Sequence, residues 1–467
     1  MIKKILTNSA IYGLAPHVPK LVSVALLPIM TQHLTDVDYG IAGTIAAYTL
    51  ALSALSNLGV SAYLQVNFFK APCQHKVLWR EIYGFLQYWM IVFSIIQSII
   101  LFFVIPKEAA NNRWLIIVLT NFNGVLFGPS GFLGTLYYQL KQQPIPIAIR
   151  SIITGVLSVI INYVLIVEFN LGYLGWYIGS FAGTFFVNII YWFDLNYKFN
   201  LKPIYYPKKR TVLKTLKISL PVVPHYYSVY LITTSNRVVM DYSGTRIGDI
   251  GLYNLAQQFV SMIDSLINAV ERAIGPLCME GIRYNKEDEV KKDIFLFAII
   301  TYIGTTLFAI WSKEVFLLFV KNESLRSAYP IAAILALALN YRPAYIAASN
   351  VFFYYENTKK LLGITFTAGI IALVLNIITI PSGGLWAAAI TTYIAFLYQG
   401  YSGFFYKFFK EKSRVEYPYL KMLILQLFLT LFAMLVIDLS VFMKIGITFI
   451  VIVLSIIGIK KYCVSKS

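Results

Sequence analysis

The motif Ala15-Pro16-His17 is followed by a long apolar run and then by Asp38-Tyr39-Gly40-Ile41. The same arrangement returns later in the chain, where Val223-Pro224-His225 precedes a similar run and then Asp249-Ile250-Gly251-Leu252. The two Pro-His pairs are 208 residues apart and the two Asp-x-Gly marks are 211 apart, so the spacing is nearly the same in both copies. This internal repeat predicts a molecule built from two similar halves.

The composition predicts an all-α polytopic membrane protein. Of 467 residues, 58% are hydrophobic and 13% are charged, whereas soluble domains carry about 25% charge. Apolar stretches of about 20 residues recur along the chain, and each is long enough to cross a bilayer as a helix. A membrane β-barrel would instead show alternating segments of about 10 residues. We predict about fourteen spans, near residues 9–31, 40–63, 84–105, 114–137, 147–167, 173–193, 218–240, 251–272, 294–311, 329–351, 361–380, 384–406, 420–437 and 443–460.

The distribution of charge predicts how the chain is oriented in the membrane. The net charge of +18 could suggest nucleic-acid binding, but 29 of the 39 Lys and Arg fall on one side if the N-terminus is cytoplasmic. That asymmetry follows the positive-inside rule, and it predicts a multi-pass membrane protein with both termini cytoplasmic, and no nucleic-acid partner. No cleavable signal peptide is expected. The richest basic loop runs from Lys198 to Lys217, where contact with anionic lipid heads is expected.

The sequence lacks the motifs of the common membrane-associated enzymes. It has no phosphate-binding Gly-x4-Gly-Lys-Ser/Thr loop, no His-Glu-x-x-His and no Gly-x-Ser-x-Gly. All predicted loops are short, so none could form a separate catalytic domain. Cys73, Cys278 and Cys463 fall on the predicted cytoplasmic side and are expected to stay reduced. These features favour a transporter without a cofactor over an enzyme.

A second pair of matches extends the repeat. Asn162 precedes Leu174-Gly175-Trp176, and Asn376 precedes Gly384-Leu385-Trp386 at a similar offset. Spans 1–6 therefore correspond to spans 7–12, which predicts an N-terminal lobe over residues 1–200, a C-terminal lobe over 201–410 and two additional spans with a tail over 411–467. Because six is even, the lobes are expected to be related by a pseudo-two-fold axis along the membrane normal, with the substrate site at their interface.

We single out three of the cations inside predicted spans, because a charge there costs at least about 2.5–3.5 kcal/mol unless it faces a cavity or a partner. Lys20 is at the centre of span 1, Arg342 is near the middle of span 10, and Arg237 is close to the outer end of span 7. We predict that they line the cavity. The alternatives are pairing of Lys20 or Arg342 with an acid on another helix, snorkelling of Arg342, and an interfacial salt bridge between Arg237 and Asp241.

Span 8 carries a polar stripe at helical spacing. Its members fall on one face at i, i+4, i+7, i+11 and i+14. They are Gln257, Ser261, Asp264, Asn268 and Glu271. The stripe predicts either a cavity wall or a set of interhelical hydrogen bonds. In the first case, Asp264 would be the counter-ion of a cation in the cavity, or a carrier of a proton or sodium ion.

The paired histidines His17 and His225 occupy equivalent places in the two halves. Histidine titrates near neutrality, so either one could couple transport to protons. The alternative is that each is a hydrogen-bonded packing residue. The pair is also useful as a marker that spans 1 and 7 are counterparts.

Several of these motifs together resemble the Wzx-type polysaccharide flippases. The resemblance rests on the run Ile218-Ser219-Leu220-Pro221-Val222-Val223-Pro224-His225, on Thr234-Ser235-Asn236-Arg237 and on Gly251-Leu252-Tyr253. Leu34-Thr35 with Asp38-Tyr39-Gly40, and the segment from Asn376 to Trp386, resemble the same family. The chain departs from it at Asn236, where Asp is more frequent. This removes a carboxylate beside Arg237.

The resemblance implies two six-helix lobes around a central cavity, in a superfamily that also includes multidrug exporters and lipid II flippases. It implies transport of oligosaccharide repeat units linked to undecaprenyl diphosphate, for O-antigen or capsule, with other polysaccharide assembly proteins as partners. Lys20, Arg237 and Arg342 would then hold the diphosphate, because guanidinium and ammonium groups bind such anions strongly. Two alternatives stay open, a cation-coupled drug or metabolite exporter and a membrane polysaccharide polymerase.

Overall fold

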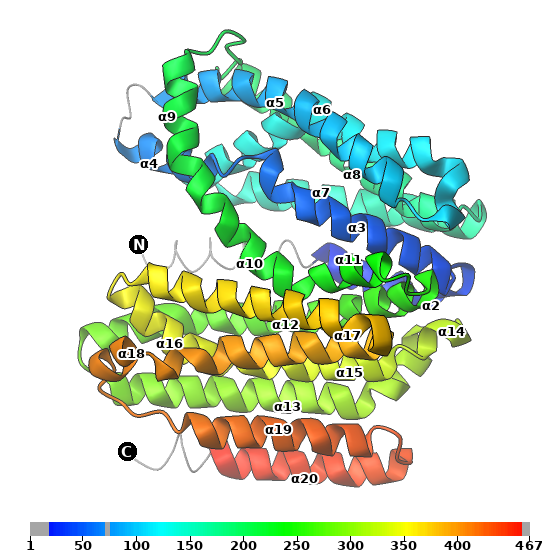
Figure 1. Cartoon of the computed structure of the whole chain (residues 1–467), viewed down its shortest axis with the longest axis vertical. Coiled ribbons are helices and arrows are strands. Elements are labelled where there is room, and N and C mark those ends of the chain that lie inside the picture. The colour runs from blue at the N-terminus through cyan, green and yellow to red at the C-terminus, as the bar shows by residue number, and fades with distance from the viewer. Residues whose placement is uncertain (1–17, 71–74, 460–467) are drawn as a thin grey trace. The chain divides into compact units, whose positions relative to one another are not determined.

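The computed structural model describes residues 18–70 and 75–459, and in these residues it is built from helices without any strand (Figure 1). The prediction of an all-α polytopic membrane fold is thereby confirmed. The chain forms two compact units, Met1–Tyr227 and Ser228–Ser467, which are described separately below. His17 lies outside the described residues.

The first unit contains the helices of the first half of the repeat and the linker that follows them. Its helices are α2 (Val18–His33), α3 (Asp36–Ser56), α4 (Ser61–Lys70), α5 (His75–Val104), α6 (Arg113–Leu140), α7 (Pro144–Tyr163), α8 (Tyr173–Phe193), α9 (Lys209–Ser219) and α10 (Val223–Thr233), which crosses the boundary between the units. Single π-turns extend α7 over Val164–Glu168 and α8 over Asp194–Lys198.

The second unit contains the remaining helices. They are α11 (Ser235–Tyr242), α12 (Ile247–Arg283), α13 (Glu287–Phe319), α14 (Glu323–Arg326), α15 (Tyr329–Ala338), α16 (Arg342–Tyr354), α17 (Thr358–Tyr401), α18 (Lys407–Lys412), α19 (Tyr419–Val436) and α20 (Val441–Ile459). Helix α13 packs against α12, α15 and α16, and also against α19 and α20, which lie beside it at one edge of this unit (Figure 1).

The division between the units differs from the predicted boundary near residue 200. The linker after α8 stays with the first unit because its backbone is bonded to α5: Ile204 donates to the carbonyl of Arg80 at 2.9 Å, and the Arg80 guanidinium donates to the carbonyl of Lys202 at 2.9 Å. The two additional helices α19 and α20, in turn, belong to the second unit rather than standing apart.

Helices α19 and α20 are held to the second unit by polar contacts as well as by packing. Lys444 on α20 is fully buried, and its Nζ contacts both carboxylate oxygens of Glu314 on α13 at 2.7 and 2.8 Å. Trp311 on α13 donates its indole N–H to Thr448 at 2.9 Å, and Tyr401 on α17 donates to Gln426 at 3.0 Å. A buried cation without such a partner would be costly, so these contacts fix where α20 lies along α13.

The aspartates that mark the repeat both act at helix N-termini. Asp38 forms a capping box with Thr35 at the start of α3, and its other carboxylate oxygen accepts a hydrogen bond from the Tyr173 amide at the start of α8, at 2.9 Å. Asp249 lies in the first turn of α12 and pairs with Arg246 at 2.9 Å. Carboxylates stabilise helix N-termini because they complement the helix dipole.

A glycine lies between the Asn and Trp marks in each half, and the two glycines have the same backbone geometry. Gly172 has φ 53° and ψ −132° just before α8, and Gly384 has φ 51° and ψ −132° inside α17. These angles are open to glycine and strained for other residues, so each glycine permits a sharp reversal between two helices. The repeat found in the sequence is therefore also a repeat of local structure.

Helix α17 is in fact two helices joined at Gly384. The Thr391 hydroxyl donates to the Asn376 side chain, although in a continuous helix these residues would be about 22 Å apart along the axis. The segment therefore folds back on itself, as spans 361–380 and 384–406 predict. The first half shows the same helix approach, since a Cβ on Gly179 would meet the Asn162 side chain at 1.9 Å.

Nine helical segments in the described residues are long and apolar enough to cross a membrane. One of them, Thr358–Phe405, contains the reversal at Gly384 and hence two predicted spans. Predicted spans 1, 7, 8 and 14 fall on helices that are shorter or carry more charge than these nine. The total of fourteen stays a prediction.

The reversal at Gly384 can be tested by adding a single methyl group. A Cβ at Gly384 would have no atom within 4 Å, so Gly384→Ala adds only backbone strain, which costs about 1–3 kcal/mol. We expect a lower Tm in detergent. Gly304, in the regular helix α13, also has open space around its Cβ position. Gly304→Ala should leave the Tm unchanged or raise it, because alanine is the better helix former. An equal effect of the two substitutions would contradict the special geometry of Gly384.

Candidate functional site

The predicted site residues that the structure describes are spread over five helices of the chain. Lys20 lies in α2 and His225 in α10, and the structure describes the backbone of both but not their side chains. His17 is outside the described residues. The remaining residues all belong to the second unit, on α11, α12 and α16: Arg237, Gln257, Ser261, Asp264, Asn268, Glu271 and Arg342.

Arg342 is positioned by a break in the helix that contains it. Helix α15 ends in a turn of 3-10 helix over Leu339–Tyr341, and α16 begins at Arg342 with Pro343 in its first turn. Proline is tolerated there because the first N–H groups of a helix have no partner within it. The break is anchored from α13, where the Thr305 hydroxyl donates to the Asn340 side chain at 2.7 Å. The sequence signal is the Asn-x-Arg-Pro pattern.

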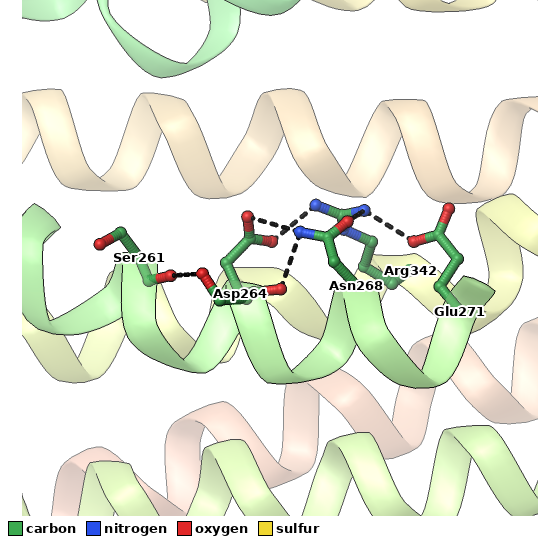
Figure 2. Close-up of polar contacts among 6 residues, drawn as sticks. Ser261, Asp264, Asn268, Glu271 and Arg342 are labelled. Atoms are coloured by element: carbon green, nitrogen blue, oxygen red, sulfur yellow. Dashed lines mark hydrogen bonds and ion pairs between the residues drawn. The ribbon is translucent and has the colours of Figure 1, made fainter. Parts of the chain in front are cut away.

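The guanidinium of Arg342 joins three members of the polar stripe of α12 (Figure 2). One terminal nitrogen, Nη2, contacts Asp264 Oδ1 at 2.6 Å, and the other, Nη1, contacts Glu271 Oε2 at 2.7 Å and Asn268 Oδ1 at 2.9 Å. The Asn268 amide in turn donates to Asp264 Oδ2 at 3.0 Å. We call these four residues, Arg342, Asp264, Asn268 and Glu271, the Arg342 cluster.

The Arg342 cluster holds one cation and two carboxylates, so it carries one net negative charge when all three are ionised. Its side chains are partly accessible, with 16% of Arg342, 32% of Asp264 and 30% of Glu271 exposed. The guanidinium also lies 5.6 Å from the ring centroid of Tyr341, which stacks on Phe396 at 4.4 Å. Charge-assisted contacts of this kind are strong, and partial exposure leaves the carboxylates open to a small cation or a proton.

Ser261 and Gln257 do not join the Arg342 cluster. The Ser261 hydroxyl donates to the carbonyl of Gln258 on its own helix at 2.7 Å, and in Figure 2 it lies to one side of the guanidinium. The stripe thus separates into a charged part that contacts α16 and a neutral part toward the start of α12.

Arg237 belongs to a different network, which is buried. Its Nη1 donates to the Asn254 side chain of α12 at 2.8 Å, and only 6% of Arg237 is exposed. Among the described residues no carboxylate forms an ion pair with it, and its Nε has no hydrogen-bond partner. The neighbouring Asn236 contacts the Tyr253 hydroxyl and, at 3.2 Å, Thr392.

These contacts show which residues the sequence reasoning missed. Asn254, Tyr253 and Thr392 hold Asn236 and Arg237 in place, yet none of the three is charged or part of a stripe. The only signal is that Asn236 and Arg237 each lie 17 residues before their partner on α12. That spacing suits two helices joined by a short turn.

The described residues contain no group of three or more His, Cys, Asp or Glu side chains arranged to hold a metal. Cys278 is a free thiol in the part of the chain that the structure describes, and it is buried. The chemistry available at the Arg342 cluster is therefore ion pairing, anion binding by a guanidinium and cation binding by carboxylates.

The fold is similar to those of several membrane transporters of known structure. The structure is similar to the lipid II flippase MurJ in an inward closed conformation, with a TM-score of 0.73, 14% identity, and coverage of 96% of this chain and 98% of that chain. It is also similar to an inward-facing multidrug resistance MATE family transporter of the MOP superfamily, with a TM-score of 0.62, 14% identity, and coverage of 85% and 93%. An outward-facing MATE transporter matches with a TM-score of 0.54, 12% identity, and coverage of 88% and 96%.

The chain belongs to the family described as polysaccharide biosynthesis protein, whose pattern matches residues 5–280. No relative among the curated proteins matches it. The similarity to solved structures shows the fold alone, because their identity to this chain is low.

The Arg342 cluster makes a prediction about stability. Arg342→Met would leave Asp264 and Glu271 without their cation, and we expect a loss of about 1–3 kcal/mol, because a partly buried charge is left uncompensated. Neutralising both carboxylates as well, in the triple variant Arg342→Met/Asp264→Asn/Glu271→Gln, should recover at least half of the loss. The measurement is thermal unfolding of the detergent-purified protein.

A matched control is available at Lys407, whose ion pair with Glu411 spans 3.5 Å and is largely exposed. Lys407→Met should change the Tm little, because exposed pairs contribute about 0–1 kcal/mol. If Arg342→Met unfolded at the wild-type temperature, the ion pairs of the cluster would contribute nothing to the fold.

Proposed function

We propose that this protein is a flippase for oligosaccharide repeat units linked to undecaprenyl diphosphate. It would move them from the cytoplasmic to the outer leaflet of the bacterial inner membrane by alternating access, for O-antigen or capsule synthesis. The observation that carries the proposal is the polysaccharide biosynthesis family match on a chain whose fold resembles a lipid II flippase over nearly its full length. In this proposal both termini are cytoplasmic, and the partners are the lipid-linked oligosaccharide, membrane lipids and other polysaccharide assembly proteins.

The Arg342 cluster supports a role in handling a diphosphate. A diphosphate competes for a guanidinium with the carboxylates that hold it, and Arg342 is shared between two of them. A proton or a sodium ion on Asp264 or Glu271 would weaken their attraction for Arg342 and release the guanidinium to the substrate. In this proposal Lys20 and Arg237 are further cationic contacts, and His17 and His225 are candidates for coupling to protons.

A second candidate function is cation-coupled export of a drug or metabolite. The net negative charge of the Arg342 cluster favours it, because a cationic substrate or coupling ion would be attracted to Asp264 and Glu271. The two functions differ in what Arg342 does. In the flippase it contacts the substrate, and in the exporter it only positions the carboxylates.

The role of Arg342 is tested in a strain that lacks the chromosomal gene and expresses variants at equal membrane levels. Arg342→Ala should lower surface polysaccharide at least about tenfold, since a contact between charged groups contributes about 1.5–3 kcal/mol. Arg342→Lys should restore part of the activity. Arg272, exposed one residue after Glu271, supplies the control, and Arg272→Ala should act as wild type.

The outcome also separates the two functions. A normal amount of surface polysaccharide with Arg342→Ala, together with loss of transport in Asp264→Asn, would contradict the contact between Arg342 and a diphosphate. That result would favour the exporter. Loss of surface polysaccharide with Arg342→Ala and a normal amount with Arg272→Ala would support the flippase.

The location of accumulated intermediates tests the class of function. After deletion of the gene, single lipid-linked repeat units should build up in the cytoplasmic leaflet, because their synthesis continues while their transfer stops. The measurement is labelling of lipid-linked sugars with a membrane-impermeant probe, before and after permeabilisation. Build-up in the outer leaflet would instead indicate a polymerase, and no build-up would indicate an exporter.

A further inference from the structure

A polar cavity of about 490 Å³ lies in the first unit, away from the Arg342 cluster. It is formed by the side chains of α4, of the first turns of α5, and of the start of α9 with the residue before it. Its lining consists of Tyr63, Asn67, His75, Val77, Leu78, Glu81, Lys208, Arg210, Thr211 and Lys214. The proposed flippase function uses none of these residues, and we call this space the α9 cavity.

The α9 cavity is bounded by segments that are fixed in place. The linker before α9 passes so close to α5 that a Cβ on Gly84 would lie 1.9 Å from the carbonyl oxygen of Ile204. The far end of α9 is held in the same way, because a Cβ on Gly59 would lie 2.7 Å from the carbonyl oxygen of Ser219. Since α9 is fixed at both ends, the cavity is a defined site rather than a gap beside a loose loop.

One wall of the cavity is strongly positive. Lys208, Arg210 and Lys214 all line it, and no ion pair involves any of them among the described residues. They flank the N-terminus of α9, an eleven-residue helix that starts at Lys209. Three cations beside a helix N-terminus form an environment in which a phosphate group is stabilised by both the side chains and the backbone N–H groups.

The part of the lining that belongs to α5 contains a carboxylate, that of Glu81. Glu81 on α5 is only 5% exposed, lines the cavity, and forms no hydrogen bond or ion pair with the described residues. A carboxylate so buried is costly unless something donates a hydrogen bond to it. The Glu81 carboxylate can therefore accept a hydrogen bond from a donor group of a ligand in the cavity.

We propose that the α9 cavity binds a phosphate ester that also carries a hydrogen-bond donor. The phosphate contacts Lys208, Arg210 and Lys214, and a hydroxyl group a few bonds away donates to Glu81. With three cations and one carboxylate, the lining keeps a net positive charge, so the ligand is an anion overall. A phosphoglycerol group has this chemistry, whether it is the headgroup of an anionic phospholipid or a water-soluble ester such as glycerol 3-phosphate.

Exposed apolar side chains near the cavity favour the lipid as the source. Leu213 and Ile218 on α9 are 55% and 46% exposed, and Val66 and Phe69 on α4 are 48% and 67% exposed. Apolar side chains beside a basic pocket suit an amphiphile, whose headgroup enters the cavity while its chains stay outside. The proposal is independent of what the protein transports.

The test is native mass spectrometry of the full-length protein in detergent with equimolar dioleoyl phosphatidylglycerol and dioleoyl phosphatidylcholine. We expect bound phosphatidylglycerol on the wild type and a loss of at least about tenfold in Lys208→Gln/Arg210→Gln/Lys214→Gln. The control, Lys359→Gln/Lys410→Gln/Lys421→Gln, removes three exposed lysines of the second unit and should change binding less than about twofold. Equal losses in the two triple variants would show diffuse attraction to basic surfaces and would overturn the proposal.

Two further experiments identify the source of the bound phosphate ester and test the role of Glu81. If glycerol 3-phosphate raises the Tm of the wild type but not of the α9 triple variant, while lipid binding is the same in both, the ligand is the soluble ester. Glu81→Gln, whose Tm is checked first, should lower the ratio of bound phosphatidylglycerol to bound phosphatidic acid about threefold, because only the former has glycerol hydroxyls. An unchanged ratio would remove Glu81 from the site, and no variant-sensitive binding of either probe would overturn the whole proposal.

Discussion

A chain that crosses hydrocarbon must satisfy its backbone N–H and C=O groups internally, and the interruptions of its helices show how this protein meets that constraint. The π-turns that end α7 and α8 are followed by the same pattern of backbone hydrogen bonds. Phe169 donates to the carbonyl of Val164 and Leu171 to that of Leu165, and Phe199 and Leu201 repeat this pattern with Asp194 and Leu195. In each turn an asparagine, Asn170 or Asn200, takes the positive φ that the reversal needs. The backbone carbonyl groups at these helix ends thus accept hydrogen bonds from residues just beyond them, which allows short connections between spans.

The same constraint applies to side chains, and it explains why the polar residues of the second unit occur in groups. A single charge within a span is expensive, so Arg342 is held by two carboxylates and an amide, and Lys444 is held by Glu314. Arg237 is held differently, since its guanidinium donates to the Asn254 side chain and forms no ion pair with an acid among the described residues. A buried guanidinium without a carboxylate costs stability.

The sequence predicts those features of the molecule that are local or periodic. The Asn and Trp marks of the repeat locate the reversals at Gly172 and Gly384, because a turn between two spans needs particular residues at particular positions. Helical spacing likewise indicates that Asp264, Asn268 and Glu271 share one face of α12. It does not indicate their partner, because Arg342 lies 71 residues beyond Glu271 and several helices could have brought a cation there. The Asn254 contact of Arg237 and the α9 cavity depend on packing in the same way.

The repeat also shows where the two halves of the sequence differ. With the 212-residue offset between Gly172 and Gly384, the counterpart of Arg342 is Ser130 and that of Arg150 is Leu362. Arg150 forms its own ion pair with Asp194, and Tyr138 donates to the same carboxylate. Each half therefore carries a charged cluster, but at positions that do not correspond. Duplication supplies a symmetric scaffold whose helices and turns agree, whereas the substrate proposed for this protein, with a charged head and neutral sugars, is not symmetric. Charges that break the symmetry are better suited to it than the Pro-His marks that repeat.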